Sequence, residues 1–136
     1  MGYKSDYARV HGLGAAGEGV THWWRQRLSS IALIPLTVLF LFPFASALGD
    51  GHEAVLALYG DMRHALIAVL MIVVTFWHLA QGLQVVIEDY VHGKVARTAL
   101  LLVNTFANFA LGAAGVLAVA TILSGARGER HGSLRL

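Results

Sequence analysis

The stretch that decides the fold is residues 65–87, ALIAVLMIVVTFWHLAQGLQVVI. It holds no Asp, Glu, Lys or Arg, and at 1.5 Å per residue a helix of this length crosses the roughly 30 Å of hydrocarbon in a bilayer. Residues 28–48 and 98–126 are also long enough to cross the bilayer and also hold no Asp, Glu, Lys or Arg. A soluble chain of 136 residues cannot bury three such helices. The sequence therefore predicts a membrane protein with three spans.

Composition agrees with this interpretation, because 57% of the residues are hydrophobic and 13% are charged, against about 25% charged in soluble domains. We expect one all-α membrane domain over residues 1–136, with a cytoplasmic arm at 1–20 and transmembrane helices at 22–48, 62–91 and 96–124. The loop between the second and third spans is short, so these two helices should be antiparallel neighbours.

Several residues suggest where the helices begin, bend and end. Thr21 is a plausible N-cap for the first span, and Asp61 for the second. Gly93 is well placed to end the second span in a left-handed turn. Pro35 lies inside the first span and should kink it, because it frees a carbonyl. Residues 49–60 read as a short external connection.

The basic residues flank the spans, which argues against nucleic acid as a partner although the sequence pI is near 9.3. Four precede the charge-free part of the first span (Lys4, Arg9, Arg25 and Arg27), and two separate the second and third spans (Lys94 and Arg97). Only Arg63 lies in the first loop, and three follow the third span (Arg127, Arg130 and Arg135). The positive-inside rule then puts the N-terminus in the cytoplasm and the C-terminus in the periplasm, although the basic C-terminal tail opposes this.

The chain has no cysteine, so it forms no disulfide and ligates no iron–sulfur cluster through thiolates. It also has no room outside the membrane for a nucleotide- or flavin-binding domain. If electrons move through this protein, another subunit must deliver them.

A single histidine, His78, lies near the middle of the second span, where an imidazole usually faces a cavity, a partner or a bound group. At 100° per residue, Gly82 and Asp89 lie within about 40° of it on the helix surface, whereas Tyr90 is turned about 120° away. His78 suits a haem ligand, and Gly82 would leave a slot for the macrocycle. The alternative is a histidine hydrogen-bonded to a neighbouring helix. As no other histidine lies mid-span, a second ligand would come from another chain.

Polar residues crowd the end of the second span. The phenol of Tyr90 could donate to a quinone carbonyl, and the carboxylate of Asp89 could pass protons with water. Alternatively, Tyr90 belongs to the interfacial aromatic belt and Asp89 is simply solvated. Arg25 and Arg27 could pair with propionates, lipid phosphates or carboxylates of a partner, and lipid is the default.

Asn104 and Asn108 in the third span could be mistaken for an ion site. We interpret them as interhelical hydrogen-bonding groups, with Gly112 and Gly115 allowing close approach of a neighbouring helix.

Three blocks carry a family resemblance: Trp23-Trp24-Arg25-Gln26-Arg27-Leu28, His78-x-x-x-Gly82, and Gln84-Val85-Val86-Ile87-Glu88-Asp89-Tyr90-Val91. Together they resemble the hydrophobic membrane anchor subunits of succinate dehydrogenase, with the His-Trp-Trp-x-Gln-Arg entry of the alphaproteobacterial form. The resemblance covers the whole chain. The third span contributes only its hydrophobicity.

The resemblance implies a subunit of respiratory complex II in the bacterial inner membrane. In that family, a flavoprotein subunit and an iron–sulfur subunit oxidise succinate outside the membrane. An anchor pair holds them there and supplies haem b and the ubiquinone site. This chain would then be half of a heterodimeric anchor bundle, beside a cytochrome b anchor subunit.

Site residues follow from the same resemblance. His78 would be one axial haem ligand, opposite a histidine of the cytochrome b subunit, and Arg27 would lie near the haem propionates and the quinone pocket. Tyr90 would donate to the ubiquinone carbonyl, with Asp89 in the proton route. Two tryptophans, Trp23 and Trp24, would contact the iron–sulfur subunit or lipid. The roles of His22 and Arg25 stay open.

Three alternatives compete with this interpretation. A fumarate reductase anchor would use the same chemistry in the other direction. A purely structural anchor would leave haem and quinone to its neighbours. A small transporter or channel subunit would need a polar path through the bilayer, and here the charged residues stop at the membrane edges.

Overall fold

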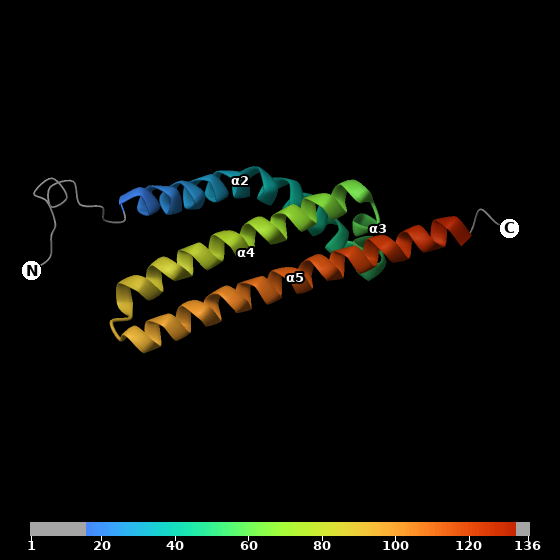
Figure 1. Cartoon of the computed structure of the whole chain (residues 1–136). Coiled ribbons are helices and arrows are strands. Elements are labelled where there is room, and N and C mark those ends of the chain that lie inside the picture. The colour runs from blue at the N-terminus through green and yellow to red at the C-terminus, as the bar shows by residue number, and fades with distance from the viewer. Residues whose placement is uncertain (1–15, 133–136) are drawn as a thin grey trace, which may run out of the picture.

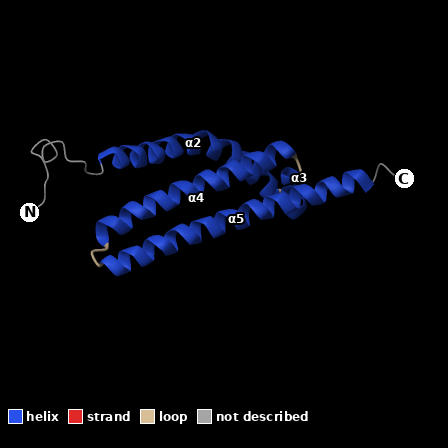
Figure 2. Ribbon diagram, in the orientation of Figure 1, coloured by secondary structure: helices blue, strands red, loops and turns tan. Residues whose placement is uncertain are grey.

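Every regular element in the described part of the chain is an α-helix. The computed structural model describes residues 16–132, with side chains described for residues 20–128. The helices are α2 (Ala16–Gly49), α3 (His52–Tyr59), α4 (Met62–Tyr90) and α5 (Lys94–Gly132), and Figure 2 shows no strand among them. Three stretches are long and apolar enough to cross a membrane, namely Val20–Gly49, Met62–Tyr90 and Lys94–Gly128. The prediction of an all-α protein with three transmembrane helices is confirmed.

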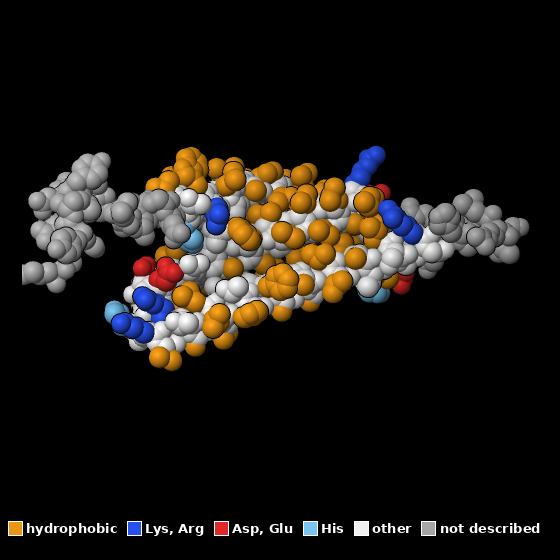
Figure 3. All heavy atoms as spheres, viewed as in Figure 1, with side chains coloured by type: hydrophobic (Ala, Val, Ile, Leu, Met, Phe, Trp, Pro, Cys, Tyr) orange, Lys and Arg blue, Asp and Glu red, His pale blue; other side chains and the backbone are white. Residues whose placement is uncertain are grey.

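α4 lies between the other two long helices (Figure 1), packing against α2 on one side and α5 on the other. Over the described residues, no Cα atom of α2 lies within 8 Å of a Cα atom of α5. α4 and α5 run antiparallel and are joined by a short turn at residues 91–93, as predicted. Figure 3 shows hydrophobic side chains over the middle of this face and charged side chains gathered at its two ends.

The close-packed core lies at the end of the bundle where α3 sits. Its buried apolar residues are Tyr59, Ala65, Ala68 and Val119. The ring of Tyr59 packs against Phe40 and Phe44, with centroid distances of 6.2 and 6.5 Å. The other end of the bundle holds no such apolar cluster among the described residues.

α3 corrects the prediction that residues 49–60 are only a connection. Eight of these residues, His52–Tyr59, form a helix that contacts α2, α4 and α5. A helix this short is marginal by itself, so its stability comes from packing over the ends of the longer helices. The apolar face that packs includes Val55 and Leu58.

The predicted N-cap of α4 is confirmed. The carboxylate of Asp61 accepts hydrogen bonds from the backbone N–H of Arg63 and from Nδ1 of His64, each at 3.1 Å. Desolvation acts to raise the pKa of Asp61, but the backbone N–H groups of His64 and Arg63, together with the His64 ring, outweigh it, so the pKa is lowered.

Two other predicted helix ends are wrong. Thr21 lies inside α2, which begins at Ala16, so residues 16–20 of the predicted arm are helical and residues 1–15 lie outside the described part. Alanine has the highest intrinsic helix propensity, so Ala16 is a favourable residue at which to begin the helix upstream of Thr21. α4 ends at Val91 in an extended conformation (φ −99°, ψ 103°), so the chain needs no left-handed residue at Gly93. The Gly93 carbonyl instead accepts from the N–H of Arg97 at 2.8 Å, in the first turn of α5.

α2 continues through both of its prolines, Pro35 and Pro43, without a break in the helix. Figure 1 shows that it curves over its C-terminal half, towards α3. This curvature brings Phe40 and Phe44 onto Tyr59.

Candidate functional site

The imidazole of His78 lies between α4 and α2, and a side chain of α2 contacts each of its two nitrogens. Nδ1 is 2.9 Å from Oγ of Ser29, and Nε2 is 3.4 Å from Nε2 of Gln26. Gln26 and Ser29 are three residues apart on α2, so both face α4. His78 is therefore hydrogen-bonded to a neighbouring helix, which was the alternative to ligation. Ligation of haem iron by His78 stays a prediction.

Gly82 lies one turn beyond His78 and faces the side chain of Gln26 on α2. A Cβ built at Gly82 would meet a single atom within 4 Å outside its own helix backbone, Nε2 of Gln26 at 3.6 Å. The space beside the His78 ring is thus filled by the end of one flexible side chain. A flat group could enter there by displacing Gln26, so these residues fit the slot that haem would need.

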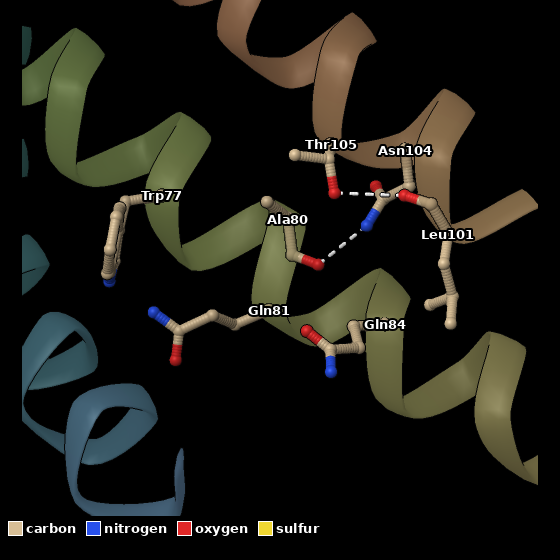
Figure 4. Close-up of a pocket in the computed structure, with 7 residues that line it drawn as sticks. All are labelled: Trp77, Ala80, Gln81, Gln84, Leu101, Asn104 and Thr105. Carbon is tan, nitrogen blue, oxygen red and sulfur yellow. Dashed lines mark hydrogen bonds between the residues drawn. The ribbon is translucent and has the colours of Figure 1, made fainter. Parts of the chain in front are cut away.

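α2 and α4 also carry buried polar atoms that have no hydrogen-bond partner among the described residues. They are Nε2 of His22, Oε1 of Gln26, Oγ1 of Thr75, and both amide atoms of Gln81. Only 8% of Gln81 is exposed, and Figure 4 shows its carboxamide pointing away from Asn104 and α5. Each buried unpaired group costs about 1–3 kcal/mol, so this region is incomplete in the isolated chain.

Among the described residues, His78 has no companion metal ligands. Within residues 20–128, no group of three or more His, Cys, Asp or Glu side chains could hold a metal ion. His78 can offer one nitrogen, and a six-coordinate iron would need its other axial ligand from elsewhere.

Asp89 and Tyr90 form the last turn of α4, at the end of the bundle away from α3. Both are exposed, and 79% of Tyr90 is accessible. No hydrogen bond or ion pair joins either side chain to another described residue. Next to them, Glu88 accepts from Nε2 of Gln84 at 2.8 Å. The phenol of Tyr90 is therefore available to a molecule outside this chain.

Trp23, Trp24 and Arg27 lie near the start of α2, at the same end of the bundle as Tyr90. The guanidinium of Arg27 stacks over the ring of Trp23 at 4.7 Å, and the two tryptophans meet edge to face at 5.2 Å. More than half of each tryptophan is exposed, as in an interfacial belt. Among the described contacts, Arg27 meets neither His78 nor Tyr90.

Of the two buried asparagines of α5, Asn104 hydrogen-bonds to α4 and Asn108 hydrogen-bonds within α5. Nδ2 of Asn104 donates to the Ala80 carbonyl at 2.8 Å (Figure 4), which confirms the predicted interhelical bond. Asn108 instead donates within α5, to Oδ1 and the carbonyl of Asn104. The predicted close approach is present, because a Cβ at Gly112 or Gly115 would lie 3.5 or 3.2 Å from side chains of α4.

Sequence reasoning missed Ser29 altogether and gave Gln26 no role, although both contact His78. A signal for them exists. His22, Gln26 and Ser29 recur at spacings of four and three, which places three polar side chains on one face of a helix that otherwise turns apolar.

The fold and this interface define a multi-pass membrane subunit with a half-completed polar site between its first two spans. A family model described as the succinate dehydrogenase/fumarate reductase transmembrane subunit matches residues 1–126. The chain belongs to this family, and its recognition from the α2 and α4 motifs as a succinate dehydrogenase hydrophobic membrane anchor subunit is confirmed.

Similar proteins carry matching names. The chain is 36% identical over 126 residues to the succinate dehydrogenase hydrophobic membrane anchor subunit of Paracoccus denitrificans, covering 93% of this chain and 97% of that one. It is 30% identical over 107 residues to the subunit of the same name from Rickettsia bellii, covering 76% and 84%. The membrane anchor subunit of Reclinomonas americana is 32% identical over 82 residues, covering 58% and 68%. No solved structure matches the chain.

Proposed function

We propose that this chain anchors a succinate:ubiquinone oxidoreductase, respiratory complex II, in the bacterial inner membrane, and that it shares haem b and ubiquinone with its partner subunits. The observation that carries the proposal is the His78 imidazole, which lies between two spans with one nitrogen against Ser29 and the other against a displaceable carboxamide over Gly82.

His78 would hold haem b through a ring nitrogen, and Gly82 would leave room for the macrocycle. When bound, haem b supplies a centre that takes up and releases one electron. Arg27 lies at the membrane edge of the same helix as Gln26 and Ser29, where a guanidinium suits a propionate. Its stacking on Trp23 keeps it at that edge.

Ubiquinone would meet the exposed end of α4. The Tyr90 hydroxyl donates to a quinone carbonyl, and the Asp89 carboxylate with water passes protons as the quinone is reduced. Both side chains are exposed and make no hydrogen bond or ion pair with another described residue, which leaves them available to a pocket shared with another subunit. Trp23 and Trp24 at the same end would contact the iron–sulfur subunit or lipid.

The partners would be a cytochrome b anchor subunit, an iron–sulfur subunit and a flavoprotein subunit. Two features support them: the chain contains no cysteine for a cluster, and the buried amide oxygen of Gln26 and both amide atoms of Gln81 lack partners among the described residues. The N-terminus would lie in the cytoplasm and the C-terminus in the periplasm. Succinate oxidation is favoured over fumarate reduction because the similar proteins are named for succinate dehydrogenase.

The test is the absorption spectrum of the affinity-purified complex carrying His78→Ala. We expect loss of the haem b bands, because one axial ligand is gone. His64→Ala is the matched control: His64 is also on α4, but at the other end, where it pairs with Asp61. A complex with His78→Ala that keeps an unchanged haem spectrum would show that the chain is a purely structural anchor.

A further inference from the structure

We propose that Ser29 is a positioning residue for His78. By accepting a hydrogen bond from Nδ1–H, it fixes the ring in the tautomer whose Nε2 lone pair faces the slot over Gly82. This inference rests on the proposed function only in taking haem iron as the group that Nε2 would bind. The contacts that support it are internal to this chain.

The first step concerns the single proton of the Ser29 hydroxyl. Oγ donates it to the backbone carbonyl of Gln26 at 2.9 Å. A hydroxyl has one proton and two lone pairs, so at 2.9 Å from Nδ1 of His78 the same oxygen can only accept. Nδ1 must therefore carry the ring proton. Ser29 is 7% exposed, which keeps water from competing for either bond.

The second step concerns the other ring nitrogen. Nε2 of Gln26 is an NH₂ group, a donor without a lone pair to offer, and it lies 3.4 Å from Nε2 of His78. Nε2 of His78 thus has to be the acceptor. In the opposite tautomer two N–H groups would face each other, and Ser29 would need a second proton. Both contacts select the same tautomer.

The two contacts differ in strength. The Ser29 contact has the length of a good hydrogen bond, whereas 3.4 Å exceeds the usual range for a donor N–H. Gln26 also lies at the end of a flexible side chain, with its Nε2 3.6 Å from where a Cβ of residue 82 would be. A metal can displace Gln26 from Nε2 while Ser29 keeps its hold on Nδ1.

This arrangement is the one that metal-binding histidines use. The nitrogen that does not bind metal donates to a fixed acceptor, which sets the ring orientation and makes the ligating nitrogen more basic, and losing that acceptor typically costs 10–100-fold in metal affinity or activity. Ser29 would serve His78 in this way across the α2–α4 interface.

The experiment is haem titration and redox potentiometry of the purified complex carrying Ser29→Ala. We expect about 10–100-fold weaker retention of haem b. We also expect a higher midpoint potential, because a less basic imidazole stabilises ferric iron less. The matched control is Ser30→Ala: Ser30 also donates to the Gln26 carbonyl at 2.9 Å but makes no hydrogen bond to His78. This control should keep the affinity and the potential of the unmodified complex.

A second pair keeps the test decisive if Ser29→Ala prevents assembly. Ser29→Thr and Ser29→Val introduce side chains of nearly the same shape that differ in the hydroxyl. Threonine should preserve the haem potential and valine should raise it. Equal behaviour of the two variants, or a Ser29→Ala complex indistinguishable from Ser30→Ala, overturns the inference.

The outcome also separates this inference from the proposed function. If His78→Ala loses haem while every Ser29 variant keeps the original potential, ligation by His78 stands and positioning by Ser29 fails. If His78→Ala retains haem, the proposed function itself fails.

Discussion

Tyr59 is the last residue of α3 and Tyr90 the last residue of α4, and they lie at opposite ends of the bundle, where burial decides what each phenol can do. Tyr59 is 7% exposed, packs against two phenylalanines, and finds no partner for its hydroxyl among the described residues. Burial raises the pKa of its phenol. Tyr90 is 79% exposed, and its hydroxyl is available to another molecule. Tyr59 thus behaves as a core aromatic residue, whereas Tyr90 can act as a donor.

Replacing Tyr90 with Phe should therefore lower quinone reduction and leave succinate oxidation intact. We expect a five- to tenfold loss, since one hydrogen bond is worth about 1 kcal/mol and 1.36 kcal/mol is tenfold in rate. The measurement compares ubiquinone reduction with reduction of an artificial acceptor that takes electrons directly from the soluble subunits.

Tyr59→Phe provides the matched control, because it removes the same atom where nothing is hydrogen-bonded to it. It should leave both activities unchanged. If Tyr90→Phe reduces ubiquinone at the original rate, Tyr90 belongs to the interfacial belt and takes no part in quinone binding.

Among single residues, the sequence alone predicted those whose polar side chains are unusual at their position in a membrane span. A lone histidine amid apolar residues stands out, and so does a polar cluster at a span end. Ser29 does not, because a serine in a membrane helix can bond to its own backbone, as it does here with Gln26. Its second contact depends on which face of α4 meets α2, and one sequence does not contain that information.

Among the elements, α3 packs closely against α5 at its C-terminal end. A Cβ added at Gly60, just after α3, would lie 2.8 Å from Cβ of Ala126 in α5 and 3.2 Å from the Leu56 carbonyl. Backbone on one side and a short side chain on the other leave little room to adjust. Gly60 therefore lets the end of α3 approach α5.

Gly60→Ala should destabilise the protein by about 1–3 kcal/mol, the usual cost of overpacking. Thermal unfolding of the detergent-solubilised complex measures it. Gly49→Ala is the control, since a Cβ there meets nothing within 4 Å. Adding Ala126→Gly to Gly60→Ala should restore much of the loss. If it restores nothing, the contact with α5 is not the cause.

The elements also show which helix ends a sequence can predict. Asp61 was predicted correctly as a cap, because its carboxylate bonds to an amide only two residues away. The three spans follow from hydrophobicity alone. α3 could not be predicted in this way, because eight residues form a stable helix here through contacts with three other helices. The extended conformation of Val91, where α4 ends, likewise could not be predicted from local sequence.

For the whole molecule, three spans in sequence put the α3 end on one side of the membrane and the α4–α5 turn on the other. The absence of native cysteine allows a clean test of orientation. We expect a cysteine replacing His52 to react with a membrane-impermeant maleimide in intact cells, and one replacing Lys94 to react only after permeabilisation. Both positions are exposed in the structure.

Leu79→Cys, mid-span on α4, serves as the control and should remain unlabelled in both conditions, because lipid shields it. The reverse pattern for His52→Cys and Lys94→Cys would invert the topology and place Tyr90 on the periplasmic side.

The separation of α2 from α5 has a mechanical consequence. The aromatic cluster of Phe40, Phe44 and Tyr59 holds the helices together at the α3 end, whereas among the described residues the N-terminal half of α2 packs against α4 and lies apart from α5. Amide hydrogen exchange should accordingly be slow around Ala65 and faster along the first turns of α2. A planar group can then enter edge-on between the N-terminal half of α2 and α4, without unfolding the apolar core at the α3 end.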